Sequence, residues 1–256
     1  MITRTELDNL VKKYETIDFI KDDPIQFPHR GRSKCKEEME LYGFIASLFA
    51  YGNRKIFIKK LDDIFLKADN DLLGFIKNGD FSVFKGVEYR FSKDNDIIPI
   101  FEILSKLYNE SRGLDELFQY GWTHPSSYPS SLERKQLFFQ TVVDYFYSNA
   151  PETVGQGFYH MIPNPQNGGA MKRMNMFLRW MVRKGPVDLG VWEFIKPSEL
   201  LIPLDVHVAR VSREMGLLTR KSNDFKAVIE LTNQLKNICP EDPIKYDFAM
   251  FGFGVK

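Results

Sequence analysis

A lysine that follows two consecutive glycines has the setting of a nucleophile. Lys172 lies in the stretch PNPQNGGAMKRMNMFLRWMVRKG, at the start of an expected helix over 171–183. Glycines such as Gly168 and Gly169 allow positive φ and close backbone approach, and the first N–H groups of a helix bind phosphate. An amine beside such a terminus and near the cationic Arg179 keeps a neutral fraction that can attack carbon. The alternative is a structural loop, because glycine-rich loops often precede helices.

An aspartate before a second expected helix is the other candidate for chemistry. Asp205 lies in LLIPLDVHVARVSREMGLL, directly before a predicted helix over 206–216. It would cap this helix, a role that contributes about 1 kcal/mol. The same geometry keeps the carboxylate ionised, so that it can stabilise a positive charge developing on a sugar. This stretch alone favours neither role over the other.

The helix that begins near Lys172 carries positive side chains at helical spacing. At 100° per residue, one face and its flanks contain Lys172, Arg173, Met176, Arg179, Trp180, Arg183 and Lys184. Such a face is typical of a surface that follows a nucleic-acid backbone. The alternative is a solvated face whose arginine stems cover apolar neighbours. Because no Asp or Glu occurs between Lys172 and Lys184, we expect the face to meet a ligand.

Helical periodicity dominates the elements that must position these residues. Predicted helices span 3–15, 36–50, 54–67, 96–109, 131–148, 152–161, 171–183, 206–216, 223–238 and 243–253. The best candidate for a strand is 81–92, and a loop is an equal alternative there. Residues 123–131 and 163–169 are predicted loops because they are rich in Pro, Ser, Asn and Gly. We therefore expect an all-α fold with short connections.

Composition limits the class of protein further. The chain has 256 residues, of which 43% are hydrophobic and 14% aromatic, so a packed core is expected and disorder is not. Two distant cysteines, Cys35 and Cys239, cannot build a zinc or iron–sulfur site, so we expect no metal and no cofactor. Neither a signal peptide nor a membrane span of roughly 18 apolar residues is visible. We expect a soluble cytoplasmic, nucleoid-associated monomer.

The charge balance gives little guidance on partners. A net charge of +1 weakly disfavours nucleic acid, yet phosphate binding needs only a local basic face. Two further pairs, His29–Arg30 and Tyr89–Arg90, combine polar with aromatic or basic side chains. We expect both pairs to be structural or exposed in loops rather than catalytic, since isolated motif matches are often false.

The glycine-lysine and aspartate stretches together resemble the helix-hairpin-helix DNA glycosylase superfamily, which includes endonuclease III and 8-oxoguanine DNA glycosylase. The resemblance lies in GGAMK, which ends at Lys172, and in the aliphatic-Pro-x-Asp-x-His-Val-x-Arg-Val pattern around Asp205. Upstream, GFIASLFAYGNRKIFIKKLDDIF resembles an early helix-turn-helix of that superfamily, in which Asn53 matches a polar residue that probes the opened duplex. The longer connection over 184–202 resembles the archaeal 8-oxoguanine glycosylase branch.

The chain also looks like an uncharacterised bacterial family placed in this superfamily by its C-terminal half. The phrases KRMNMFLRWMVR, LLIPLDVHV and EDPIKYDFAMFGFG carry that likeness. Two departures from the superfamily are visible: the hairpin lacks its usual Leu-Pro-Gly-x-Gly pattern, and the C-terminal iron–sulfur cysteines of endonuclease III are missing.

The resemblance implies two helical lobes, a helix-hairpin-helix element and an active-site cleft between the lobes. One lobe would span 37–203, with the hairpin at 152–183, and the other would combine 1–36 with 204–256. Double-stranded DNA would be the partner. The implied DNA contacts are Gly168, Gly169, Arg173, Arg179, Arg183 and Asn53, and the implied base pocket contains Trp192, His207 and Phe248.

The implied function is base-excision repair of an oxidised purine such as 8-oxoguanine, with accompanying AP lyase activity. Cleaving an N-glycosidic bond builds positive charge on the deoxyribose, which Asp205 would stabilise. Lys172 would attack C1′ and form a Schiff base, after the target base is flipped out of the duplex. Two alternatives stay open: a non-catalytic DNA-binding protein of the same fold, and a helical protein unrelated to DNA.

Overall fold

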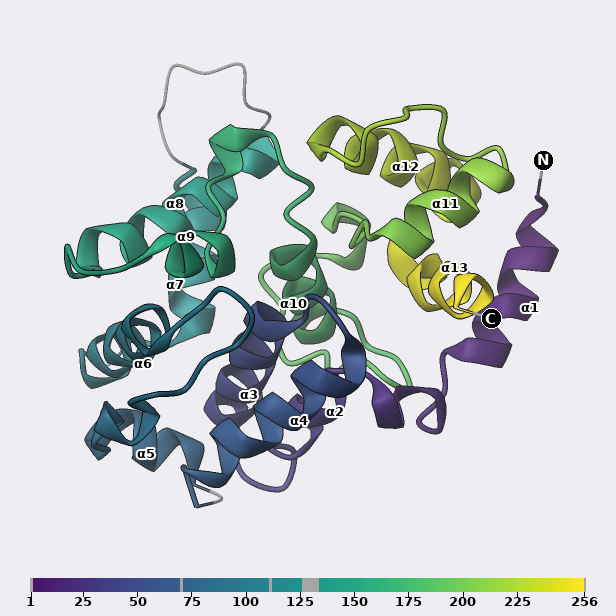
Figure 1. Ribbon diagram of the computed structural model, residues 1–256. Coiled ribbons are helices and arrows are strands. Elements are labelled where there is room, and N and C mark those ends of the chain that lie inside the picture. The colour runs from purple at the N-terminus through teal and green to yellow at the C-terminus, as the bar shows by residue number, and fades with distance from the viewer. Residues whose placement is uncertain (1, 70, 111, 126–133, 256) are drawn as a thin grey trace. The chain divides into compact units, whose positions relative to one another are not determined.

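The computed structural model describes the whole chain except residues 1, 70, 111, 126–133 and 256. About 64% of the protein is helical, and no strand occurs in the part that the structure describes (Figure 1). Extended pairing there is limited to single bridges, such as those between Gly169 and Asp224 and between Tyr89 and Ser92. The expected all-α class is therefore confirmed.

The chain folds into two compact units. Unit 1 comprises Met1–Gln26 and Gly168–Lys256, and unit 2 comprises Phe27–Asn167. The expected lobes had different boundaries, since residues 27–36 fall in unit 2 and residues 168–203 fall in unit 1. The second difference has a physical cause, because the helix that follows the glycines is bound by ion pairs to acidic residues from both ends of the chain, as described below.

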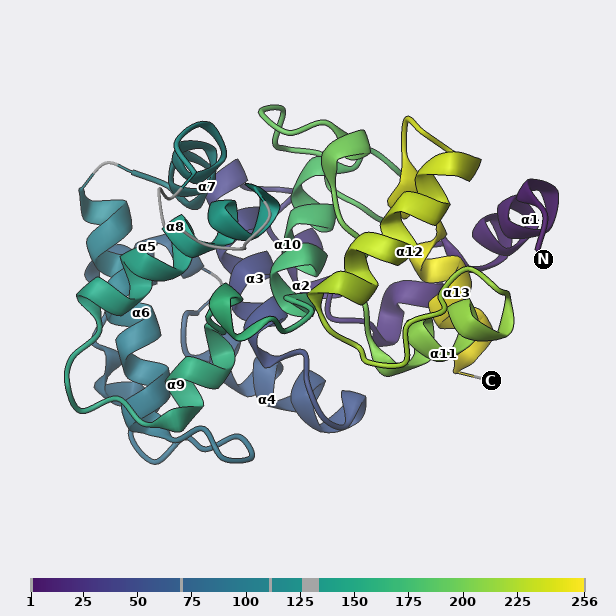
Figure 2. The same ribbon diagram turned by 90° about the horizontal axis from the view of Figure 1, so that it is seen from above.

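The described residues of unit 1, 2–26 and 168–255, form five α-helices and short 3-10 turns. Its helices are α1 (Arg4–Tyr14), α10 (Lys172–Val182), α11 (Val206–Glu214), α12 (Phe225–Ile238) and α13 (Asp247–Gly254). Its 3-10 turns are η1 (Phe19–Asp22), η4 (Pro197–Glu199) and η5 (Pro243–Tyr246). Helix α13 packs against both α1 and α11 (Figures 1 and 2). Close packing on α1 requires a glycine, because a Cβ on Gly252 would lie 2.4 Å from the Tyr14 ring.

Side-chain caps fix where the helices of unit 1 begin. The Thr3 hydroxyl accepts the Glu6 N–H, and the Glu6 carboxylate accepts the Thr3 N–H, which completes a capping box on α1. Asp224 accepts the Ala227 N–H at 3.0 Å and caps α12. Each cap satisfies a backbone donor that a helix end leaves unpaired, so short polar residues determine these boundaries.

The helices of unit 2 include α3, which is almost fully buried. The helices are α3 (Lys36–Phe49), α4 (Arg54–Leu66), α5 (Leu72–Asn78), α6 (Asp94–Asn109), α7 (Leu114–Thr123), α8 (Arg134–Asn149) and α9 (Gln156–Met161), with α2 (Gln26–His29) at the boundary of the units. Two 3-10 turns, η2 (Phe81–Phe84) and η3 (Pro165–Asn167), complete it. Helix α3 contacts α4, α5 and α7. Its Phe44 ring stacks on Phe146 at 5.3 Å and meets Phe118 edge-on, so large rings fill the core.

Most predicted helices occur within a few residues of their expected bounds. The candidate strand over 81–92 is instead the 3-10 turn Phe81–Phe84 followed by a tight turn over 89–92. The loop expected at 163–169 contains the 3-10 turn Pro165–Asn167, and most of the loop expected at 123–131 lies outside the described residues. Across the described helices, none combines the length and apolar character needed to cross a bilayer.

Candidate active site

The two glycines form an exposed turn that leads into α10. Gly168 has φ +69, in the left-handed region that favours glycine, and no atom lies within 4 Å of a Cβ built on it or on Gly169. The Gly168 carbonyl accepts the Phe225 N–H at 2.9 Å, so the turn is fastened to the start of α12. Met171, with φ 50, then occupies the N-cap position of the helix. The backbone on this side of the turn is therefore open to a ligand.

Lys172 and Asp205 each stand at the beginning of a helix in unit 1. Lys172 is the first residue of α10, and its side chain is half-buried. Asp205 is the N-cap of α11, where its Oδ1 accepts the Val208 N–H at 2.8 Å. The capping role expected of Asp205 is confirmed. The residue is half-buried, so its carboxylate can meet solvent or a substrate while Oδ1 caps the helix.

The sequence predicted that the arginines of α10 form an exposed cationic surface, and this prediction is wrong. The side chain of Arg179 is 0% exposed, Arg183 is buried, and Arg173 is only 9% exposed. Met176 and Trp180 on the same helix are buried as well. Because a phosphate contact requires an accessible guanidinium, these residues do not form the DNA-facing surface that the helical pattern suggested. Trp180 is a core residue for the same reason.

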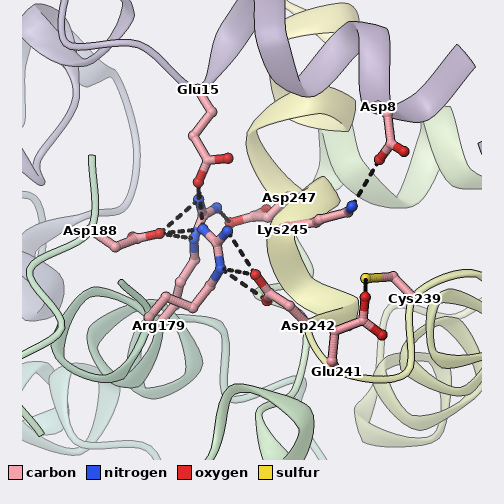
Figure 3. A network of polar contacts seen from close by, with 10 residues as sticks. Asp8, Glu15, Arg179, Asp188, Cys239, Glu241, Asp242, Lys245 and Asp247 are labelled. Atoms are coloured by element: carbon pink, nitrogen blue, oxygen red, sulfur yellow. Dashed lines mark hydrogen bonds and ion pairs between the residues drawn. The ribbon is translucent and has the colours of Figure 1, made fainter. Parts of the chain in front are cut away.

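Acidic residues from distant parts of the chain enclose the two buried arginines. The Arg179 guanidinium donates to Asp247 at 2.5 Å and to Asp188 at 3.3 Å, with Glu15 at 3.5 Å (Figure 3). The Arg183 guanidinium donates to Glu15 at 2.5 Å, to Asp188, and to both carboxylate oxygens of Asp242. We call these six residues the arginine–carboxylate network.

The network contains more negative than positive groups. Two guanidiniums face four carboxylates, all from unit 1. The pKa of Asp247 is raised to about 6. Burial is the main cause, and the charges of Asp205 and Asp188 also raise this pKa, whereas Arg179 lowers it. The charge of Asp205 therefore acts on Asp247, which connects the cap of α11 electrostatically with the network on α10.

Aromatic rings border the network on the α13 side. The Arg179 guanidinium lies 4.2 Å from the centre of the Phe248 ring, in the range of a cation–π contact. Phe19 meets Phe248 edge-on at 5.9 Å, and the half-buried His207 meets Phe251 at the same distance. Of the expected base-pocket residues, His207 and Phe248 thus lie on the neighbouring helices α11 and α13.

Trp192, the third residue of the expected base pocket, packs elsewhere. It is buried, and its ring meets Phe177 of α10 edge-on at 5.2 Å. Its backbone N–H donates to the Met181 carbonyl at 2.8 Å. These contacts make Trp192 part of the core that holds α10 in place.

Asn53 belongs to unit 2, where it caps α4. Its side-chain oxygen accepts the Ile56 N–H at 3.3 Å, and the residue is exposed. Gly52 before it has φ +80, so the turn between α3 and α4 depends on a glycine. The predicted role of Asn53 in contacting opened DNA stays a prediction, as does the pairing of α9 with α10 in a hairpin, because these elements fall in different units.

Sequence reasoning missed the acidic half of the network. Asp242 stands at the N-cap position of the 3-10 turn Pro243–Tyr246, yet it pairs with Arg183 and makes no side-chain cap bond. One feature of the sequence could have indicated buried arginines that need carboxylate partners. Arg179 and Arg183 lie four residues apart, on a helix whose opposite face is apolar. Across the residues that the structure describes, no group of His, Cys, Asp and Glu has the arrangement of a metal site.

These features define an all-α protein of two compact units, with a glycine turn, two helix-terminal polar residues and a buried arginine–carboxylate network. The chain belongs to the family described as protein of unknown function DUF2400, which it matches over residues 23–256. No curated protein and no solved structure matches it.

Proposed function

We propose that this protein is a DNA glycosylase with AP lyase activity that removes an oxidised purine, such as 8-oxoguanine, from double-stranded DNA. The observation that carries the proposal is the placement of Lys172 and Asp205. Both stand at helix N-termini of the same compact unit, one behind an open glycine turn and the other as a cap with a half-buried carboxylate. These are the two residues that the resemblance assigns to chemistry.

The arginine–carboxylate network supports this arrangement by fixing α10. Arg179 follows Lys172 by about two helical turns and so lies on the same face of α10. Its partner Asp247 feels the charge of Asp205, so the network lies close to both helices that carry the proposed reactive groups. A buried, multiply paired arginine is held more rigidly than an exposed one, and a reactive amine gains from such a rigid support.

The proposed reaction needs a nucleophile and a fixed negative charge. The lone pair of the neutral Lys172 Nζ attacks C1′, and the bond from C1′ to the base breaks with both electrons on the base. The attached amine loses a proton and the departing base gains one. The Asp205 carboxylate stabilises the positive charge of the sugar during this step. Ring opening gives a Schiff base, and loss of a C2′ proton then expels the 3′ phosphate.

Phosphate binding in this proposal depends on the backbone rather than on arginines. Arg179 and Arg183 are already paired with carboxylates, so they are not the source of the DNA affinity. The exposed glycine turn presents backbone groups beside a helix N-terminus, which suits a phosphate. This also fits the low net charge of +1, because backbone N–H groups bind anions without adding formal charge.

Borohydride trapping on a panel of lesion-containing duplexes tests the proposal. The wild-type protein is expected to form a covalent adduct with an oxidised-purine duplex, and Lys172→Gln is expected to bind that duplex without forming the adduct. Lys184→Gln is the matched control, because Lys184 is exposed and paired with Glu193 at 3.2 Å. Trapping by Lys172→Gln at the wild-type level would contradict the assignment.

The same experiment separates the two alternatives. Salt-dependent duplex binding by the wild type without any adduct would indicate a non-catalytic DNA-binding protein. Absence of duplex binding at low salt would indicate a helical protein unrelated to DNA.

A further inference from the structure

A tight turn in unit 2 carries two exposed side chains at its tip. The Tyr89 N–H donates to the Ser92 carbonyl at 2.8 Å, and the Ser92 N–H donates back to the Tyr89 carbonyl at 3.0 Å. Arg90 and Phe91 lie between them. Arg90 has φ 56, in the left-handed region that residues with a Cβ rarely adopt. We call residues 89–92 the Arg-Phe turn.

The Arg-Phe turn is fastened to the end of α3 by side-chain hydrogen bonds. The Tyr51 hydroxyl bonds to the Ser92 hydroxyl at 3.0 Å and donates to the Tyr89 carbonyl at 3.4 Å. The Tyr89 hydroxyl donates to the Tyr51 carbonyl. Burial raises the pKa of Tyr89 to about 12, so this donor keeps its proton at any physiological pH. These hydrogen bonds hold the turn against Tyr51, two residues after the end of α3.

The two tip side chains are held in defined positions although they face outward. Phe91 is 49% exposed, and its ring meets the His160 ring edge-on at 4.5 Å and stacks on Tyr51 at 5.8 Å. The Arg90 side chain lies over Gly52, where a Cβ would come within 2.7 Å of Nη1. The exposed cap residue Asn53 is the next residue along the chain. An exposed guanidinium and an exposed aromatic ring thus stand at the tip of the turn, and the guanidinium lies beside Gly52, the residue that precedes Asn53.

This combination differs from an ordinary exposed apolar residue. Isolated surface apolar side chains are common and need no explanation. Here, however, the buried residues Tyr89 and Ser92, together with the strained Arg90, place a cation and an aromatic ring at consecutive exposed positions of one turn. A fixed ring stacks on an unpaired nucleobase of any sequence, and a neighbouring arginine pairs with the phosphate that follows it. Proteins that bind single-stranded nucleic acid commonly combine these two kinds of contact.

We propose that Phe91 stacks on a nucleobase exposed where a duplex has been opened, and that Arg90 contacts the adjoining phosphate. The proposal rests on the proposed function for the source of the opened duplex, but it concerns unit 2 alone. Phe91 and Arg90 would thus contact the opened duplex in addition to Asn53. The strained turn would hold these two side chains in position. A protein partner on the same surface is the competing occupant, and the experiment below excludes or reveals it.

The test uses the full-length protein and a duplex with a tetrahydrofuran site, which cannot be cleaved as a glycoside, opposite 2-aminopurine. Wild-type protein is expected to bind this duplex more tightly than an intact one and to change the 2-aminopurine fluorescence. Phe91→Ala should weaken binding about tenfold and abolish the fluorescence change, whereas Phe91→Trp should retain both. Arg90→Ala should reduce the slope of log affinity against log salt by about 0.9.

Leu66→Ala is the matched control, because Leu66 is a 76% exposed apolar residue on α4 of the same unit. It is expected to bind as the wild type does, and thermal unfolding of every variant excludes loss of fold. If Phe91→Ala bound the duplex and changed the fluorescence as the wild type does, the inference would be overturned. If borohydride trapping were also intact, the proposed function would still stand. Phe91-dependent binding without trapping would support the inference and contradict the proposed function. Failure of the wild type to prefer the opened duplex would also overturn the inference and leave the surface to a protein partner.

Discussion

The Arg179 guanidinium donates to the Asp247 carboxylate across 2.5 Å and thereby joins the last turn of α10 to the first residue of α13. The pair is buried, with the Phe248 ring beneath the guanidinium. Ion pairs of this kind cost desolvation energy when they form, but removing one partner leaves a buried charge unpaired. The pair is therefore important for stability, whatever the protein binds.

Arg179→Ala is expected to lower the free energy of unfolding by about 3–5 kcal/mol, because it strands carboxylates that are shielded from water. Urea unfolding measures the change. Lys184→Ala, at an exposed position of the same segment, should change stability by no more than about 0.5 kcal/mol. If Arg179→Ala instead kept the wild-type stability and reduced the salt dependence of DNA binding, the arginine would be a phosphate contact after all.

The stability that Asp247 contributes should decrease as the pH rises from about 4 to about 6. Its pKa is raised from 3.8 to about 6 in the folded protein, mainly by burial, so the folded state holds a proton that the unfolded chain has already released. Stability falls with pH wherever the folded state binds more protons. We expect the unfolding free energy of the wild type, minus that of Asp247→Asn, to fall across this window. Parallel curves for the two proteins would contradict the raised pKa.

Asp205→Asn should separate the cap from the chemistry. Asparagine caps a helix nearly as well as aspartate, so the melting temperature should change little, while loss of the negative charge should reduce single-turnover base excision about 100-fold or more. Excision per folded molecule and thermal unfolding are measured on the same preparation. A large fall in melting temperature with excision intact would show that Asp205 is a cap and nothing else.

The fold class and most helices could be predicted from the sequence, because long amphipathic segments show the helical period clearly. Helices α5 (Leu72–Asn78) and α7 (Leu114–Thr123) were not among the predicted helices. Residues 81–92 alternate in polarity like a strand, but the part of the chain that the structure describes contains no strand with which they could pair.

The candidate site could be predicted only in part. Asp205 was identified because a cap is a local feature, and its cap bond spans three residues. The partners of Arg179 and Arg183 are not local, since Glu15 lies 164 and 168 residues away and Asp247 lies 68 residues away. A helical wheel of α10 therefore shows positive charge without the carboxylates that neutralise it, and burial was mistaken for exposure.

The arginine–carboxylate network also imposes an order on folding during synthesis. Unit 2 is one continuous segment, so it can fold while later residues are still being added. Unit 1 needs Glu15 near the start of the chain together with Asp242 and Asp247 near its end. Until Asp247 leaves the ribosome, the ion pairs of Glu15 and of the arginines of α10 are incomplete. Helix α1 is thus synthesised before unit 2 but gains its last ion-pair partners only after unit 2 is complete, and in that interval it is accessible to chaperones and proteases.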